Sequence, residues 1–555
     1  MHRLILPILI LIFCCSLVLP SCTQTAASAS QQEVQPLGLF DCTEDDAAQL
    51  TAALTETDML PTLRASVPGT DTRHELPAAY ADKTPAYYLS LDMAQSGWDS
   101  VSLSAAGCDI YLVSDTPLPE KSELLSSGQM LTLLFCGERY YSYANLICTG
   151  LPVLQIDLYD AETGKTTTAT AVDRTAVPMY FSYYDGADPA GGTVASASSA
   201  GKIRLRGGTS AKYDKHSFKI SFYDDITLTD QNNLSLCGLR SDDDWILNAM
   251  YQEETKIRDM LAYDLWEDIG ADYYGDGTFL GTRMRYVELI FGGRYWGLYG
   301  LCEPEDAKQF GISETNPGCV YKVASWVVPT VDELQETIRN DLDRVADVEL
   351  KYPNPADSYR DAWKPFLDYV EVTYESADFY FDKTADTLLD QKNLADLWIF
   401  LNITSARDNR WKNLYLTYRE DNGKLVMAPW DCDITFGLSW QEGDWESLHL
   451  YHEQYAFYEI QDMPVLARYI ELNTGEFQKT LSDRWNALRG DWLSAEEIIS
   501  RARAFRARLE DSGALTRNRR RWPGSGDTVT LSFLEEYVNF RIPYIDDYIA
   551  SLTAD

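Results

Sequence analysis

The sequence predicts an α+β fold, in which a small all-β, sandwich-like domain precedes a larger mixed domain. Residues 36–150 contain short runs rich in Tyr, Val and Leu that are separated by turn residues, which is typical of a β-sandwich. From Leu151 onward, strand-like runs alternate with helical patterns. We therefore expect a β-module over 36–150, a mixed domain over 151–480, and a C-terminal helical part of that domain over 481–555.

The first 22 residues have the features of a bacterial lipoprotein signal peptide. A short basic start precedes an apolar run over 4–19, and Leu19-Pro-Ser-Cys22 is similar to a lipobox. The run is too short for a typical spanning helix, and residues 23–35 are small and polar, as a flexible tether would be. We expect an exported protein held by lipid on Cys22 at the outer face of a bacterial membrane, with no other membrane contact.

Composition excludes some partners and some kinds of site. The formal net charge of -38 disfavours nucleic acid and anionic lipid surfaces as partners. Five His residues make a His-rich metal centre improbable on composition alone. Eight Cys residues follow Cys22 with no Cys-x-x-Cys pair, so disulfides such as Cys136–Cys148 or Cys302–Cys319 and buried free thiols both remain open.

Hydrophobic patterns locate the main elements in chain order. Apolar residues recur every four positions within 253–269, which predicts a helix that ends at Gly270. A Gly292-Gly293 turn between two apolar runs predicts a hairpin over 284–301. We expect strands at 86–91, 100–103, 109–113, 130–136, 140–147, 151–157 and 180–184, and helices within 330–400, 480–512 and 532–552.

Residues 202–222 concentrate basic side chains in an otherwise acidic chain. They read as a strand, the polar turn Arg206-Gly-Gly-Thr-Ser210, and a second strand with Lys215 and Lys219. Backbone N–H groups at a Gly-containing turn, with Lys and Arg beside them, can bind phosphate oxygens. A hairpin with charges on its solvated face is the alternative reading.

Residues 398–437 carry acids where two predicted loops meet. An apolar segment over 398–403 leads to Asp408 and Asn413, and a turn at 421–423 then reverses the chain between two strands. The second strand ends before Asp431 and Asp433, which the hairpin should return to the neighbourhood of Asp408. Carboxylate and amide oxygens suit Mg²⁺. A solvated, capped loop is the alternative.

Residues 151 to about 480 resemble the CotH kinase family, which comprises atypical protein kinases similar to spore coat protein H. The matching segments stand in the family's order: Arg206-Gly-Gly-Thr-Ser210 with Lys215 and Lys219, Trp245-Ile-Leu-Asn-Ala249, Ile257-Arg258, Gly293 to Glu303, Asp408 with Asn413, Trp430-Asp-Cys-Asp433, and Thr435-Phe-Gly437. The family's Arg-Gly-Asn-Ser-Ser is here Arg-Gly-Gly-Thr-Ser. The pair Glu253-Glu254 stands near the place of an Asp that precedes the helix Arg in the family.

The resemblance implies an atypical protein-kinase-like fold and transfer of the γ-phosphoryl group of ATP to protein Ser or Thr hydroxyls. As in protein kinases, Asp408 would be the catalytic-loop acid, which orients the hydroxyl or joins the metal site, with Asn413 five positions on. Asp431 would bind Mg²⁺ or Mn²⁺, assisted by Asp433 and Asn413. The expected nucleotide-binding residues are Arg206, Ser210, Lys215 or Lys219, and Glu303 as partner of that lysine.

Two other functional classes stay open from the sequence. A metal-dependent phosphohydrolase could use the same acids to activate water. A catalytically degenerate surface lipoprotein could instead bind a glycan or a protein partner through its β-module and its Tyr- and Trp-rich surface. The protein substrate is not identifiable from the residues.

Overall fold

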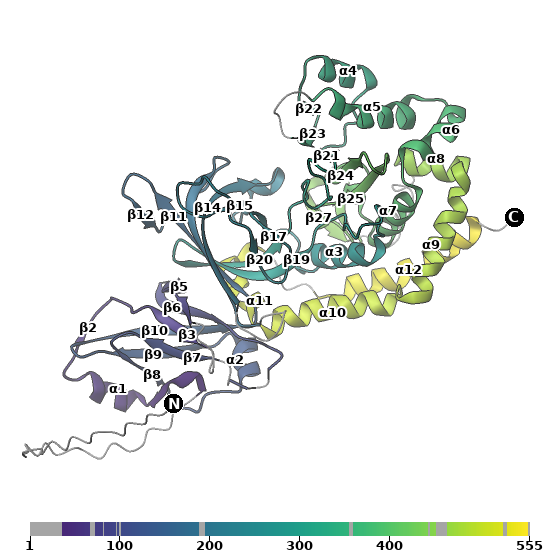
Figure 1. Ribbon diagram of the computed structural model, residues 1–555. Helices are drawn as coiled ribbons and strands as arrows, with labels where there is room; N and C mark the ends of the chain where they lie inside the picture. The colour runs from purple at the N-terminus through teal and green to yellow at the C-terminus, as the bar shows by residue number, and fades with distance from the viewer. Residues whose placement is uncertain are drawn as a thin grey trace, which may run out of the picture.

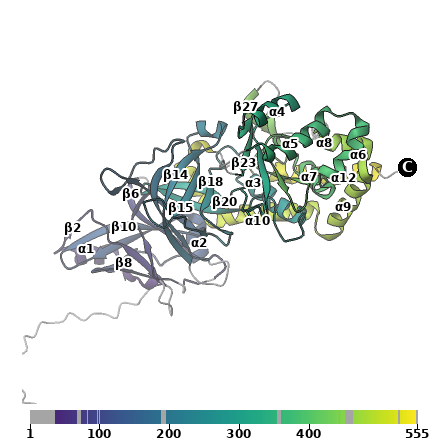
Figure 2. The same ribbon diagram turned by 45° about the horizontal axis from the view of Figure 1, so that its top comes forward.

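The computed structural model describes residues 36–552, apart from 67–72, 82, 96, 99–100, 188–194, 354–358, 442–443, 451–462 and 526–529. The predicted signal peptide, Cys22 and the tether lie outside these residues. The described chain is elongated, with the N-terminal module at one end and a group of helices at the other (Figures 1 and 2). None of the described helices combines the length and the hydropathy needed to span a bilayer.

The N-terminal module consists of two packed sheets. One has the order β1-β8-β9-β10-β6 and the other the order β4-β3-β7, and side chains from both meet in one apolar core. The strands are β1 (Phe40–Cys42), β2 (Thr55–Glu56), β3 (Leu63–Ser66), β4 (Arg73–Leu76), β5 (Ala79–Ala81), β6 (Thr84–Ser90), β7 (Ser102–Ala105), β8 (Asp109–Val113), β9 (Met130–Cys136) and β10 (Tyr140–Thr149).

The module is not all-β, so that part of the prediction was wrong. It contains the short helices α1 (Glu44–Thr51) and α2 (Lys121–Ser127). Helix α1 begins with a capping box, in which the Thr43 hydroxyl accepts from the backbone of Asp46 and the Asp46 carboxylate accepts from the backbone of Thr43. Three acids in its first turn favour the helix electrostatically. These local signals outweigh the surrounding strand pattern.

A closed barrel follows the module and forms the centre of the molecule. Its strands pair in the ring β11-β13-β14-β15-β18-β20-β19, and a parallel pairing of β19 with β11 closes the ring. The bounds are β11 (Val153–Asp160), β12 (Lys165–Thr167), β13 (Val177–Asp185), β14 (Ala195–Arg206), β15 (Ser217–Tyr223), β16 (Leu234–Ser235), β17 (Ser241–Asp242), β18 (Asp244–Asn248), β19 (Met284–Phe291) and β20 (Arg294–Cys302). The predicted hairpin over 284–301 is confirmed as β19 and β20.

Alternation along the strands decides which residues fill the barrel. Phe218, Ile220 and Phe222 of β15 belong to the buried barrel core, together with Ile203 of β14. Because successive side chains point to opposite faces, Arg206 and Lys219 lie on the outer face. Strand β14 therefore ends with a basic side chain that points away from the barrel core.

A second sheet lies beyond the barrel, after the connector 303–317. Its order is β22-β23-β21-β24-β25, with bounds β21 (Gly318–Val323), β22 (Arg344–Val345), β23 (Val348–Tyr352), β24 (Leu414–Arg419) and β25 (Leu425–Pro429); a separate hairpin follows as β26 (Leu438–Gln441) and β27 (Asp444–Leu450). The predicted hairpin around 421–423 is confirmed. The helical prediction for 330–400 was wrong for residues 344–352, which form a strand pair that extends this sheet.

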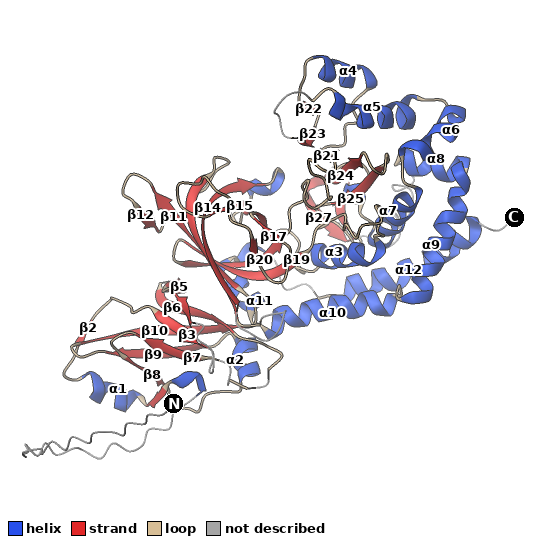
Figure 3. Ribbon diagram, in the orientation of Figure 1, coloured by secondary structure: helices blue, strands red, loops and turns tan. Residues whose placement is uncertain are grey.

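Helices surround the second sheet and extend from it (Figure 3). They are α3 (Arg258–Ile269), α4 (Val331–Arg339), α5 (Lys364–Val370), α6 (Asp378–Leu388), α7 (Gln391–Thr404), α8 (Pro464–Leu472), α9 (Phe477–Asp491), α10 (Ala495–Asp511), α11 (Ala514–Arg521) and α12 (Ser532–Leu552). Every residue of α7 from Asn393 to Thr404 is buried, so this helix is the centre of the largest apolar core. Its C-terminal end presents the loop that contains Asp408.

The structure shows whether the cysteines form disulfides. All eight of those in the described chain are free thiols, and the two disulfides considered from the sequence are not formed. Cys302 ends β20 of the barrel, whereas Cys319 lies in β21 of the second sheet.

Candidate functional site

The first acidic loop begins where α7 ends. Ser405 takes a left-handed backbone conformation (φ 49°) and terminates the helix, and a short 3₁₀ turn over Arg407–Asn409 then carries Asp408. The Asp408 carboxylate is buried and accepts hydrogen bonds from Lys412 Nζ (2.8 and 3.1 Å) and from Asn413 Nδ2 (2.9 Å). Two donors therefore fix the orientation of this acid.

The second acidic loop is joined to the first through backbone hydrogen bonds. The Asn413 carbonyl accepts from the backbone N–H of Trp430 at 2.9 Å, just beyond the last pair of the β24–β25 ladder. Asn413 and Asp431 both have positive φ angles, 55° and 60°. Such strained backbone persists where surrounding structure imposes it, and it is frequent at functional sites. The hairpin thus returns Asp431 to the vicinity of Asp408, as the sequence predicted.

Asp259, Asp408, Asp431 and Asp433 affect one another electrostatically. Burial, with a further contribution from the charge of Asp431, raises the pKa of Asp408 to about 6, against the opposing effect of Lys412. Burial and Asp431 raise the pKa of Asp259 to about 7. Burial raises the pKa of Asp433 well above its ordinary value, and Asp431, Asp259 and Asp408 add to the shift. A cation would relieve this repulsion.

The carboxylate oxygens of these acids suit a divalent cation that keeps some of its bound water. Among the described side chains, no hydrogen bond reaches the carboxylates of Asp431 or Asp433, and Asp259 Oδ1 is buried without a partner. No three His, Cys, Asp or Glu residues of the described chain are arranged to hold an ion by themselves. Mg²⁺ takes one or two carboxylates and completes its octahedron with water and phosphate oxygens, so the residues fit Mg²⁺ in that mode.

Helix α3 holds the second acidic loop in place. The Asp431 backbone N–H donates to the Tyr263 hydroxyl at 3.1 Å, and Arg258 Nε donates to the Thr435 carbonyl at 2.9 Å. Arg258 also forms a buried ion pair with Glu253 at 2.6 Å. Glu253 in addition accepts from the first backbone N–H groups of the helix, which explains why α3 begins at Arg258 and not at 253.

The predicted phosphate turn lies beside the same acids. The charge of Asp433 contributes to the raised pKa of Tyr213, after burial, which places the turn close to that carboxylate. Gly207 has a φ of 105°, and a Cβ there would collide with Ser210 Oγ, so the turn requires glycine at this position. Arg206 stacks on Trp430, with its guanidinium 4.6 Å from the ring centroid. Arg206 therefore lies against the residue that directly precedes Asp431 in the chain.

The two candidate lysines have other partners. Lys215 precedes β15, so it does not share a strand with Lys219, contrary to the sequence-based expectation. Its buried Nζ donates to the carbonyls of Ala249 (2.8 Å) and Leu298 and to Asn518 Oδ1 (3.1 Å), and burial lowers its pKa well below the usual range. Lys219 pairs with Asp244 at 2.7 Å.

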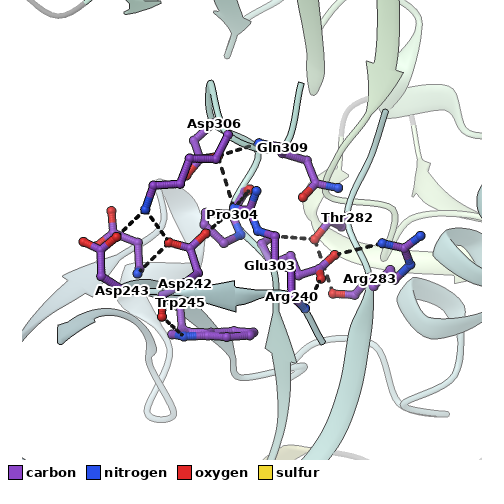
Figure 4. Close-up of polar contacts among 12 residues, drawn as sticks. Arg240, Asp242, Asp243, Trp245, Thr282, Arg283, Glu303, Pro304, Asp306 and Gln309 are labelled. Atoms are coloured by element: carbon purple, nitrogen blue, oxygen red, sulfur yellow. Dashed lines mark hydrogen bonds and ion pairs between the residues drawn. The ribbon is translucent and has the colours of Figure 1, made fainter. Parts of the chain in front are cut away.

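The expected ion pair between Glu303 and one of these lysines is wrong, because the partners of Glu303 are Arg240 and Arg283 (Figure 4). It is fully buried, accepts from the backbone N–H of Arg240 at 3.0 Å, and lies 3.6 Å from Arg283 Nη1. Arg240 in turn bonds the Pro304 carbonyl and Asp306 Oδ1, both at 3.1 Å. The network fixes the connector between the barrel and the second sheet.

Four residues near the acids were not identified from the sequence. Lys412 stands four positions after Asp408, a spacing that could have suggested a pair. Asp259 follows the predicted helix Arg directly. Glu305 and Lys322 had no such signal, because the charges near them come from segments far away in the chain.

Comparison with known proteins adds one match. The model of one protein family, described as CotH kinase protein, matches residues 203–550. The matched range begins within β14 and includes the phosphate turn, both acidic loops and the C-terminal helices. No curated protein matches the chain.

Proposed function

Because this chain belongs to the CotH kinase protein family, we propose that it transfers the γ-phosphoryl group of ATP to a Ser or Thr hydroxyl of a protein substrate. The observation that carries the proposal is the convergence of two strained loops on one group of acids. One acid, Asp408, is held by two donors, whereas Asp431 makes no side-chain hydrogen bond within the described chain. Phosphoryl transfer requires both features: one acid held in a fixed orientation, and a second acid whose carboxylate is available to a ligand.

Asp408 is positioned to accept the proton of the attacking hydroxyl. Lys412 and Asn413 fix its carboxylate, and a pKa of about 6 leaves it mostly ionised at neutral pH yet basic enough to take a proton. The turn over 207–213, near Asp433, offers backbone N–H groups to the phosphates. These residues orient the two reactants, which is the main contribution of protein to this chemistry.

Asp431 is the principal residue for holding Mg²⁺, and Asp433 or Asp259, whose pKa values its charge raises, would supply the second carboxylate. When bound, the ion would neutralise charge on the phosphates. Mn²⁺ has similar ligand preferences and could substitute. The side-chain Nδ2 of Asn413 already donates to Asp408, so its proposed part in metal binding is confined to the side-chain amide oxygen, Oδ1.

The test is isothermal titration of the full-length protein with ATP and Mg²⁺, followed by measurement of phosphate incorporated into protein. Asp431→Ala should abolish Mg²⁺-dependent binding and reduce transfer by about 10²–10³-fold. Glu420→Ala is the matched control, since Glu420 is an exposed acid at the far end of the same hairpin. Absence of binding by folded wild-type protein would contradict the proposal. Release of phosphate without incorporation would instead identify a phosphohydrolase.

We also propose that the protein is a lipoprotein on the outer face of a bacterial membrane, anchored through Cys22. The basic start, apolar run and lipobox-like segment support this location. Cys22→Ala should move the protein from the membrane fraction to the soluble fraction of the producing cells, and an unchanged distribution would refute the anchor.

A further inference from the structure

Three charged side chains between the barrel and the second sheet lack charge partners. They are Arg206 at the end of β14, Glu305 in the connector, and Lys322 in β21. Within the described chain, none of the three forms a salt bridge or a side-chain hydrogen bond. In a protein with a net charge of -38, two cations without an acid partner indicate that their partner is a ligand.

The Glu305 carboxylate lies in an environment that disfavours its charged form. Only 3% of its surface is exposed, and neither carboxylate oxygen has a hydrogen-bond partner among the described atoms. Burial raises its pKa well above the usual range, opposed first by Lys322 and then by Arg206. The contacts of Arg240 with Glu303, Pro304 and Asp306 fix the chain on both sides (Figure 4). The connector therefore cannot easily turn Glu305 toward solvent.

Lys322 lies within electrostatic reach of both Glu305 and the metal-binding acid. Burial, together with the charges of Arg206 and Lys351, lowers its pKa to about 8, while Asp431 and Glu349 oppose the shift. Lys322 is in turn the charge that most opposes the raised pKa of Glu305. Its Nζ lies 5.8 Å from the centroid of the Tyr415 ring of the adjacent strand. In the part of the chain that the structure describes, Lys215 and Lys219 interact with groups other than Asp431.

We propose that Lys322 and Arg206 are the side chains that bind the nucleotide phosphates, and that Glu305 positions Lys322 by accepting a hydrogen bond from it. The inference rests on the proposed function and reassigns the roles expected for Lys215, Lys219 and Glu303. A phosphate held by the ion at Asp431 would lie within reach of both cations. Phosphate oxygens would supply the missing acceptors, and Glu305 would gain a partner in the ordered Lys322 ammonium.

The first experiment compares MgATP affinity among full-length variants. Lys322→Ala should weaken binding by at least about tenfold, because a charge-assisted hydrogen bond is lost. Lys351→Ala is the matched control on neighbouring β23, where Lys351 is paired with Glu349, and it should change affinity by less than about twofold. Wild-type affinity should fall from pH 7 to pH 9 as Lys322 loses its proton, and Lys322→Arg should remove that dependence.

Glu305 is tested through its coupling to Lys322. Glu305→Gln keeps an oxygen acceptor and should retain most of the affinity, whereas Glu305→Leu should weaken binding nearly as much as Lys322→Ala. The double variant Glu305→Leu/Lys322→Ala should bind no more weakly than Lys322→Ala alone, which a role in packing would not produce. If the affinity losses of the two single variants add up in the double variant, Glu305 does not act by positioning Lys322.

The outcomes separate this inference from the function on which it rests. If Asp431→Ala abolishes binding while Lys322→Ala binds like wild type, the function stands and the reassignment is wrong. Loss of binding in Lys219→Ala alone would likewise overturn the reassignment. If wild-type protein does not bind MgATP, both the proposed function and the reassignment are wrong.

Discussion

At the scale of single residues, the site is defined by which charges have partners. Asp408 has two donors, Lys215 has three acceptors, and Lys219 has one acid. The side chains of Asp431, Arg206 and Lys322 form no hydrogen bond or ion pair within the described chain. Asp408, Lys215 and Lys219 already have their partners, so Asp431, Arg206 and Lys322 are the side chains available to a ligand.

The protonation of Asp408 predicts a pH dependence of phosphoryl transfer. Its raised pKa of about 6 means that the carboxylate accepts protons increasingly as pH falls through that value. Transfer should therefore rise between pH 5 and pH 7 with a midpoint near 6 in the enzyme–substrate complex. Asp408→Asn should lower the maximal rate by about 10²-fold and remove this limb of the profile.

Steady-state rates at saturating MgATP would measure this effect, with Lys412→Met as a second variant. Removing the Lys412 ammonium removes a charge that lowers the pKa of Asp408, so the midpoint should move to higher pH. An unchanged midpoint in Lys412→Met would assign the pH dependence to another group.

At the scale of elements, helix α3 acts as the support of the second acidic loop. Its first residue, Arg258, joins Glu253 and the Thr435 carbonyl, and the hydroxyl of Tyr263 in its second turn accepts from the Asp431 backbone N–H. Strand β14 supplies Arg206 to the same place by stacking on Trp430. Elements far apart in the sequence therefore fix a loop that has little regular structure of its own.

Arg258→Ala should destabilise the protein by about 3–5 kcal/mol, because it leaves the Glu253 carboxylate buried without its cation. It should also reduce MgATP binding, since the loop with Asp433 loses its anchor at Thr435. Urea unfolding measures the first effect. Arg503→Ala provides the control: this exposed side chain pairs with Glu535, and its loss should cost about 1 kcal/mol or less. Equal costs for the two variants would contradict the argument.

At the scale of the whole molecule, a buried ion pair connects three parts of the chain. Arg517 of α11 forms two 2.8 Å hydrogen bonds with Glu288 of barrel strand β19, and its Nη1 donates to the Cys148 carbonyl of β10 at 3.4 Å. The C-terminal helices thus return to the N-terminal module and the barrel (Figure 1). We infer that the module and the family domain are stabilised together.

Arg517→Met should destabilise the protein by about 3–5 kcal/mol, because Glu288 would remain buried and charged. The double variant Arg517→Met/Glu288→Leu should recover much of that loss, since no isolated charge remains. Thermal and urea unfolding of the three proteins would measure these effects. If the double variant is less stable than Arg517→Met, the ion pair contributes more to the free energy of unfolding than compensation of the Glu288 charge alone.

Much of the fold could be predicted from local sequence. The β24–β25 and β19–β20 hairpins and the helix of 258–269 follow from turn residues and apolar spacing, which act over a few positions. The strands of 344–352 could not be predicted in the same way, because they are stabilised by pairing with β21 and not by their own composition. Closure of the barrel likewise depends on β11 pairing with β19, more than 100 residues away.

The sequence by itself determined that Asp408, Asn413 and Asp431 belong together, since they lie at or near the ends of one hairpin that local signals specify, but it did not identify Asp259. Only the tertiary structure decided the cations and their partners. Lys215 is bound by Asn518, and the unpaired Lys322 lies near Glu305 and Arg206 from other elements. The physical reason is range: turn chemistry acts between neighbours in the chain, whereas burial and charge act between neighbours in space.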